Sequence, residues 1–125
     1  MRITSRVNKS SKEIMKKLLE LKGNICIYQG EELGLHETEV KFEDLKDPFG
    51  KNFWPEFKGR DGCRTPMPWN SKKINLGFSD AKPWLPVNSA YAAKSAKQQH
   101  TDPDSMLNYT KAVSYTHLTL PTTYG

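Results

Sequence analysis

Hydrophobic positions recur at helical spacing near the start of the chain. The apolar side chains that fall on one helical face are Ile14, Met15, Leu18 and Leu19. Ser10 and Glu13 fit a capping box, in which the serine accepts from the amide three residues on and the glutamate reaches back. Gly23 can adopt the left-handed conformation that ends many helices. The pattern predicts a helix over Ser10–Lys22 that packs its apolar face into a core.

A short apolar run, Ile25–Tyr28, follows this helix directly. It is rich in β-branched residues and apolar on both faces, which favours a strand of a parallel sheet covered by helices. Helix, glycine turn and buried strand form half of a β/α repeat, so we expect an α/β fold. Glu31 and Glu32 come just after the run, where polar residues of β/α folds line the active-site face.

The segment Asp47–Trp69 has neither a helical nor a strand pattern. It combines four prolines, three glycines and five aromatic residues. Prolines remove backbone donors and glycines favour turns, whereas the rings need a place to be buried. We expect a long, packed loop, and such loops usually carry function. Its rings and charged residues suit a sugar pocket, and a purely structural loop is the alternative.

Later segments carry weaker patterns. Residues 33–45 favour a short helix in their latter part, and Ser89–Gln99 contains helix-forming alanines and lysines. Asp102 and Pro103 match an N-cap and first helical position, which predicts a further helix from there. From Val113 onward the helical stripe is lost, so we expect this helix to end near residue 112.

The net charge of the chain does not alter the predicted fold class and bears only on possible partners. The chain carries a net +5, and residues 1–22 hold seven basic and two acidic residues. A small basic nucleic-acid-binding protein is one hypothesis. The basic segment has no interleaved aromatic residue to stack bases, so we interpret it as the solvated face of the first helix and expect no nucleic-acid partner.

Metal, cofactor and membrane classes are not indicated. The two cysteines, Cys26 and Cys63, form no ligand spacing with the three histidines. No run approaches the roughly 18 apolar residues of a membrane span. The start of the chain lacks the apolar core of a secretory signal. We therefore expect no metal, no cofactor and no membrane contact, and a cytoplasmic protein.

Several long motifs together resemble bacterial α-glucosidases of the α-amylase superfamily. In chain order they are Ile27–Leu35, Asp47–Gly50, Gly59–Trp69 and Pro83–Val87, and Asp102–Tyr109 is similar to the last barrel helix of that group. The resemblance covers Arg2 to about Ala112. It implies a fragment of a (β/α)8 TIM barrel with the seventh helix at Ser10–Lys22, the eighth strand at Ile25–Tyr28, its long loop and the eighth helix. A whole barrel needs about 250 residues, so this is not a complete domain.

The resemblance implies an enzyme that hydrolyses terminal α-linked glucose from oligosaccharides with retention, by two carboxyl groups. The family's nucleophile and acid lie on strands four and five, and its third carboxylate precedes a stretch that Arg2–Arg6 resembles. The chain then holds no catalytic residue and is inactive alone. Gly59–Cys63 and Trp54–Phe57 favour α-1,4 linkages over isomaltose cleavage. A non-enzymatic barrel relative is a further alternative.

The resemblance also implies site residues. Arg60 would lie at the floor of the glucose pocket, paired with an aspartate from early in the family's chain, and bind sugar hydroxyls. Glu37 would face the aglycone side. The residues expected to support the site are Glu31, Glu32, Asp61 and Arg64. Cys63 has no base beside it in sequence and is expected to be packed.

The end of the chain departs from the family pattern. Residues 113–125 supply neither apolar positions at helical spacing nor basic residues, and they contain the run Thr-Leu-Pro-Thr-Thr. We expect residues 1–112 to be barrel and residues 113–125 to be a non-native tail that resembles translated adapter sequence. A natural flexible terminus is the alternative.

Overall fold

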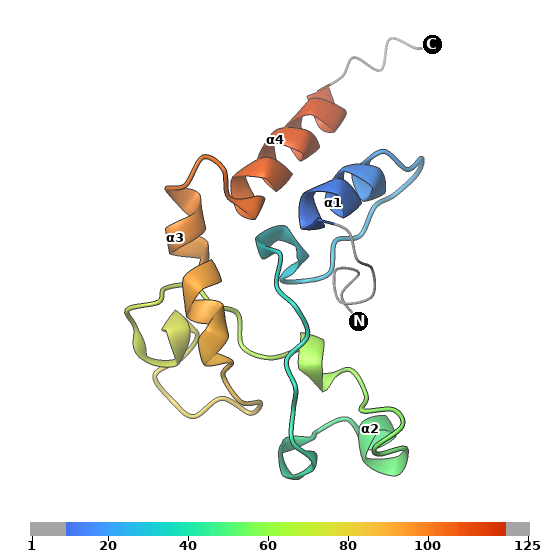
Figure 1. Cartoon of the computed structure of the whole chain (residues 1–125), viewed down its shortest axis with the longest axis vertical. Helices are drawn as coiled ribbons and strands as arrows, with labels where there is room; N and C mark the ends of the chain where they lie inside the picture. Colours follow the sequence, from blue (N-terminus) through green and yellow to red (C-terminus); the bar gives the residue numbers. More distant parts are fainter. Residues whose placement is uncertain (1–9, 120–125) are drawn as a thin grey trace.

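The structure, a computed structural model, describes residues 10–119. Its α-helices are α1 (Ser11–Leu19), α2 (Pro48–Asn52), α3 (Ala96–His100) and α4 (Met106–Thr119) (Figure 1). Short 3-10 helices lie between them: η2 (Glu31–Leu33), η3 (Phe42–Asp44), η4 (Asp61–Cys63), η5 (Ile74–Gly77) and η6 (Ser89–Lys94). Within residues 10–119 no strand forms. The sequence interpretations of Arg2–Arg6 and of residues 120–125 lie outside the described part.

The predicted first helix is confirmed at its start and is shorter at its end. The Ser10 hydroxyl accepts from the Glu13 amide at 3.3 Å, as the capping pattern predicted. The apolar stripe buries Met15 and Leu19, and α1 packs against α4. The helix ends at Leu19 because the Leu21 amide bonds the Leu18 carbonyl at 3.2 Å, which tightens the last turn. Gly23 has φ +93° but lies in the turn beyond the helix.

The predicted strand at Ile25–Tyr28 does not form in the described chain. The segment is extended, and Cys26 is exposed rather than covered on both faces. A parallel strand exists only by bonding to neighbouring strands, and within residues 10–119 no other segment supplies one. The run has strand composition but no sheet to join.

A small core forms where segments far apart in the sequence meet. Leu33, Leu35 and Tyr91 are its buried centre. The partly buried residues packed around them are Met67, Leu76, Ala96 and Leu107. The η2 turn lies against α1 and α4, so the start and the end of the described chain meet beside this turn (Figure 1).

Gln99 is the polar hub that joins the pieces around this core. Its Nε2 donates to the carbonyls of Leu33 and Lys94, each at 2.9 Å, and its Oε1 accepts from the Leu107 amide at 2.9 Å. Its own carbonyl accepts from the Ser105 hydroxyl at 2.7 Å. One buried amide side chain therefore satisfies main-chain groups of η2, η6 and α4 together.

Two expectations for the middle of the chain were wrong in detail. The loop Asp47–Trp69 contains α2 and η4. It buries residues of its second half such as Asp61 and Cys63, but its five aromatic rings, which were expected to be buried, are exposed or half-buried. The predicted helix at Ser89–Gln99 divides at Ser95 into η6 and α3. Ser95 is extended and fully buried, which interrupts the helical backbone. A short helix in residues 33–45 is present as η3.

The last helix begins later and runs further than expected. Asp102 caps a turn, where its Oδ1 accepts from the Asp104 amide at 2.9 Å, so α4 does not start there. The Ser105 hydroxyl accepts from the Asn108 amide at 3.2 Å at the start of α4. Helical structure continues past Val113 to Thr119, against the predicted end near residue 112. The non-native origin of residues 113–125 stays a prediction.

Removing the polar hub should loosen the whole fold. Gln99→Leu leaves two carbonyls and one amide without their bonds, and an unsatisfied buried group costs about 1–3 kcal/mol. We expect a loss of about 3 kcal/mol of unfolding free energy in urea titrations followed by circular dichroism. Gln98→Leu, an exposed position on the same helix, is the matched control and should change little. Equal midpoints for the two variants would contradict the hub role.

Candidate functional site

Asp47 joins the two ends of the loop. Its Oδ1 accepts from the Phe49 amide at 3.0 Å and so caps α2, which begins at Pro48. Its Oδ2 accepts from the Arg60 amide at 2.9 Å. One carboxylate therefore fixes both the start of a helix and a residue thirteen positions later.

Asp61 returns the same kind of contact. It is 1% exposed, and its Oδ2 accepts from the amides of Lys46 at 2.6 Å and Asp47 at 2.9 Å. The two carboxylates are therefore linked through the main chain. Asp47 accepts from the amide of Arg60, which directly precedes Asp61, and Asp61 accepts from the amide of Asp47. We call this arrangement the two-aspartate clasp.

Glycines allow the clasp to close. A Cβ at Gly59 would lie 2.7 Å from the Asp47 Oδ2, and Gly59 has φ +75°. A Cβ at Gly50 would lie 2.5 Å from the Lys58 carbonyl oxygen, and one at Gly62 would lie 2.5 Å from that of Thr38. At Gly50 and Gly62 the close contacts are with backbone oxygens, so a side chain does not fit there, whereas at Gly59 the positive φ also favours glycine.

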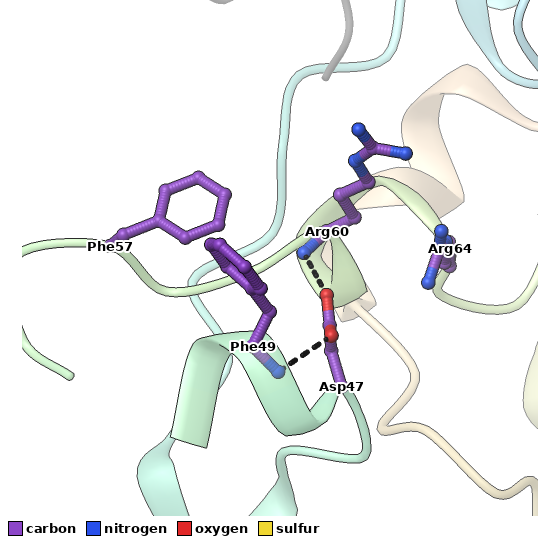
Figure 2. A pocket seen from close by; sticks show the side chains of 5 residues that line it. All are labelled: Asp47, Phe49, Phe57, Arg60 and Arg64. Atoms are coloured by element: carbon purple, nitrogen blue, oxygen red, sulfur yellow. Dashed lines mark hydrogen bonds between the residues drawn. The ribbon is translucent and has the colours of Figure 1, made fainter. Parts of the chain in front are cut away.

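A pocket of about 290 Å³ opens beside the clasp. It is lined by Asp47, Phe49, Phe57, Arg60 and Arg64, and we call it the Arg60 pocket (Figure 2). The Phe49 and Phe57 rings meet edge to face with centroids 5.3 Å apart. Figure 2 shows the Arg60 guanidinium extending away from the Asp47 carboxylate, while the Arg60 amide points at it. The pocket combines apolar ring surface with two guanidinium groups.

The carboxylate of Asp47 and the guanidinium of Arg64 each favour the charged form of the other. The pKa of Asp47 is lowered, chiefly because the Arg60 amide donates to the ionised carboxylate. Burial opposes this shift, whereas the Phe49 amide and the charges of Arg64 and Arg60 add to it. The pKa of Arg64 is raised, first by a hydrogen bond with Tyr28 and then, against burial, by nearby charges that include Asp47.

The structure brings some of the predicted site residues together and places others apart. Arg60 and Arg64 line the pocket, and Asp61 lies buried behind it. Glu31 and Glu32 shape the turn after Ile25–Tyr28, where their carboxylates accept from the amides of Tyr28 at 3.1 Å and Gly30 at 2.9 Å. Neither glutamate lines the Arg60 pocket.

Glu37 is half-buried and is not among the residues that line the Arg60 pocket. Cys63 is 1% exposed, and its Sγ donates to the Arg60 carbonyl at 3.2 Å, which agrees with the predicted packed role. Asp47 was missed as a site residue. Its signal was present, because Asp47-Pro48 carries the same N-cap and proline pattern that was noted at Asp102-Pro103.

In the described chain, no group of three or more acidic, histidine or cysteine side chains could hold a metal ion. No helix of residues 10–119 has the length and apolar character needed to cross a membrane.

Comparison with known families decides what kind of chain this is. The sequence matches the family described as "Alpha amylase, catalytic domain" over residues 1–117. The chain belongs to the alpha-amylase catalytic-domain family. The catalytic domain of this family is a TIM barrel, so the chain is part of such a barrel.

Curated relatives are glycosidases by name. The chain is 53% identical over 92 residues to a "Probable alpha-glucosidase" of Rhizobium meliloti (strain 1021), covering 74% of this chain and 16% of that protein. It is 39% identical over 120 residues to "Probable oligo-1,6-glucosidase 2" of Bacillus subtilis (strain 168), covering 82% and 21%. The chain thus spans about a fifth of the length of the relatives it matches.

Solved structures agree with this placement. An alpha-glucosyl transfer enzyme superposes with a TM-score of 0.84 at 46% identity, covering 92% of this chain and 21% of that one. A trehalose-6-phosphate hydrolase of Bacillus licheniformis superposes with a TM-score of 0.82 at 30% identity, covering 94% and 25%. The separate helices and loops seen here therefore follow the course of one section of a larger catalytic domain.

The lowered pKa of Asp47 predicts a specific acid response. The folded state favours the ionised carboxylate, so Asp47 contributes stability above its unfolded pKa of about 3.9. That contribution is lost as the pH falls from there through the lower folded pKa. Carbon-13 NMR of the Asp47 carboxyl should show a midpoint below about 3.9. A midpoint above that value would contradict the amide contacts of the clasp.

Proposed function

We propose that this chain forms the sugar-pocket section of an α-glucosidase that releases terminal α-linked glucose from oligosaccharides with retention. The observation that carries the proposal is the Arg60 pocket in a chain of the alpha-amylase catalytic-domain family. Relatives named as an alpha-glucosidase and an oligo-1,6-glucosidase support the substrate class.

The proposed section of the barrel runs over residues 1–112. In this proposal α1 is the seventh barrel helix, Ile25–Tyr28 is the eighth strand, and α4 belongs to the eighth helix. Exposed rings outside the Arg60 pocket support the idea that further polypeptide covers this surface: Trp69 is 51% exposed and Trp84 69%. An extended run of strand composition without strand neighbours in the described chain supports it too.

The chemistry divides between this section and the rest of the enzyme. The rest supplies the nucleophile, the acid and the third carboxylate, which form and hydrolyse a glycosyl-enzyme intermediate. Here Arg60 donates to sugar hydroxyls and to a partner carboxylate, since its planar fork can make two bonds at once. The rings of Phe49 and Phe57 contact the apolar face of the sugar. Glu37 faces the aglycone side, whereas Asp61 and Arg64 hold the pocket's shape.

Linkage preference is part of the proposal. Residues Gly59–Cys63 and Trp54–Phe57 favour α-1,4 bonds, although named relatives include both an alpha-glucosidase and oligo-1,6-glucosidases. The test uses a hybrid enzyme, in which residues 10–112 of this chain replace the corresponding segment of the Rhizobium meliloti relative. Faster release of glucose from maltose than from isomaltose supports the α-1,4 assignment, and the reverse order overturns it.

The isolated 125-residue chain should not hydrolyse 4-nitrophenyl α-glucoside. The nucleophile, acid and stabilising carboxylate are contributed by other parts of the barrel in this proposal. The hybrid enzyme should hydrolyse it at a rate comparable to that of the unaltered relative. Turnover by the pure chain above buffer background, or a folded hybrid without activity, would overturn the proposal.

Arg60→Ala in the hybrid enzyme should lower kcat/KM by about 100-fold or more, because a buried charged partner is left unpaired and sugar bonds are lost. Arg60→Lys should fail as well, since an ammonium cannot make the two-pronged contact. Lys51→Ala, an exposed cation on α2 outside the pocket, is the control and should keep normal kinetics. Near-normal kinetics of Arg60→Lys would remove Arg60 from the sugar site.

A further inference from the structure

The two oxygens of the Asp47 carboxylate have separate tasks. Oδ1 accepts from the Phe49 amide at 3.0 Å, which is an ordinary helix cap. Oδ2 accepts from the Arg60 amide at 2.9 Å, which lies across the loop. A helix cap uses only one of the two oxygens, so the bond between Oδ2 and the Arg60 amide is not needed to cap α2.

We propose that Asp47 is the positioning residue of the sugar site, which sets the main chain of Arg60 and thereby aims its guanidinium at the substrate. This inference deepens the proposed function and rests on it, because the role of Arg60 as a sugar ligand comes from there. Asp47 itself need not touch the sugar.

The main chain of Arg60 is held on both sides. Its amide donates to Asp47, and its carbonyl accepts from the Cys63 amide and from the Cys63 Sγ, each at 3.2 Å. The side chain of Arg60 is exposed, and Figure 2 shows it leaving the clasp in the opposite direction. Its direction therefore depends on where these bonds fix the main chain.

The approach to Arg60 is shaped to let this bond form. Gly59 precedes Arg60 with φ +75°, and a Cβ there would lie 2.7 Å from the same Asp47 Oδ2. Asp61 follows Arg60, and its Oδ2 accepts from the Asp47 amide at 2.9 Å. Gly59 thus leaves room for the Asp47 carboxylate beside the Arg60 amide, and Asp61 holds the main chain of Asp47 in place. A helix cap by itself requires neither of them.

Asp47→Ser separates the two tasks. Serine is a good cap and keeps an acceptor for the Phe49 amide, but its short side chain cannot also bond the Arg60 amide. In the hybrid enzyme we expect kcat/KM to fall about 10- to 100-fold, because a misplacement of about 1 Å can cost 100-fold. Asp102→Ser is the matched control, since Asp102 also precedes a proline and accepts from the amide two residues on, at 2.9 Å. That control should stay within about twofold of the parent.

A double-mutant cycle tests whether Asp47 acts through Arg60. Arg60→Ala keeps the amide that Asp47 binds but removes the guanidinium. Asp47→Ser should then add little to the loss already caused by Arg60→Ala, because there is no guanidinium left to aim. If the double variant instead loses kcat/KM by the product of the two single-variant losses, Asp47 acts independently of Arg60 and the inference is overturned. Full activity of Asp47→Ser in the parent background would do the same.

A measurement on the chain itself keeps the inference separate from the proposed function. Amide hydrogen exchange of the 125-residue chain should become faster at Arg60 in Asp47→Ser, while exchange at Phe49 stays protected by the serine cap. Unchanged exchange at Arg60 overturns the positioning role even if the hybrid enzyme is inactive. An active hybrid with an unaffected Asp47→Ser variant overturns the inference and leaves the proposed function standing.

Discussion

The side chains of Asp47 and Asp61 accept hydrogen bonds from four backbone amides, and these bonds close the loop of residues 46–61. Asp61 is almost fully buried, so its contacts are protected from water and serve as the base of the loop. Asp47 lies nearer the surface and extends this base to Phe49 and Arg60. A segment rich in proline and glycine has few regular backbone partners, and side-chain carboxylates take their place.

The rest of the pocket depends on this clasp. Phe49 is the second helical residue of α2, so the cap that starts α2 also places its ring against Phe57. Arg60 and Arg64 flank η4, whose first residue is Asp61. In the proposed sugar site, carboxylates that hold main-chain amides would form a rigid base and leave the longer arginine side chains to contact the ligand. Pre-set positions of this kind lower the cost of binding.

A second constraint is that one section of a barrel cannot provide all the strand-pairing and packing partners that its own residues need. Ile25–Tyr28 has the composition of a buried parallel strand, yet within residues 10–119 it stays extended without a ladder. Large apolar side chains at Phe49, Trp69, Phe78 and Trp84 are about half or more exposed. The local turns and caps persist because their bonds are short in sequence or made by buried side chains, as at Gln99.

The sequence by itself determined the local features: the Ser10 cap, the apolar stripe of α1, a long loop rich in proline and glycine, and the motifs that indicate the alpha-amylase family. These depend on neighbouring residues or on long exact patterns, which a single sequence displays. The tertiary structure decided the shorter end of α1, the break at Ser95, the start of α4 at Met106 and its extension to Thr119. It also decided that Asp47, and not Glu31 or Glu32, belongs to the Arg60 pocket. The reason is physical, because which carboxylate meets which amide depends on how a loop folds back over more than ten residues, and close approaches at three glycines set that path.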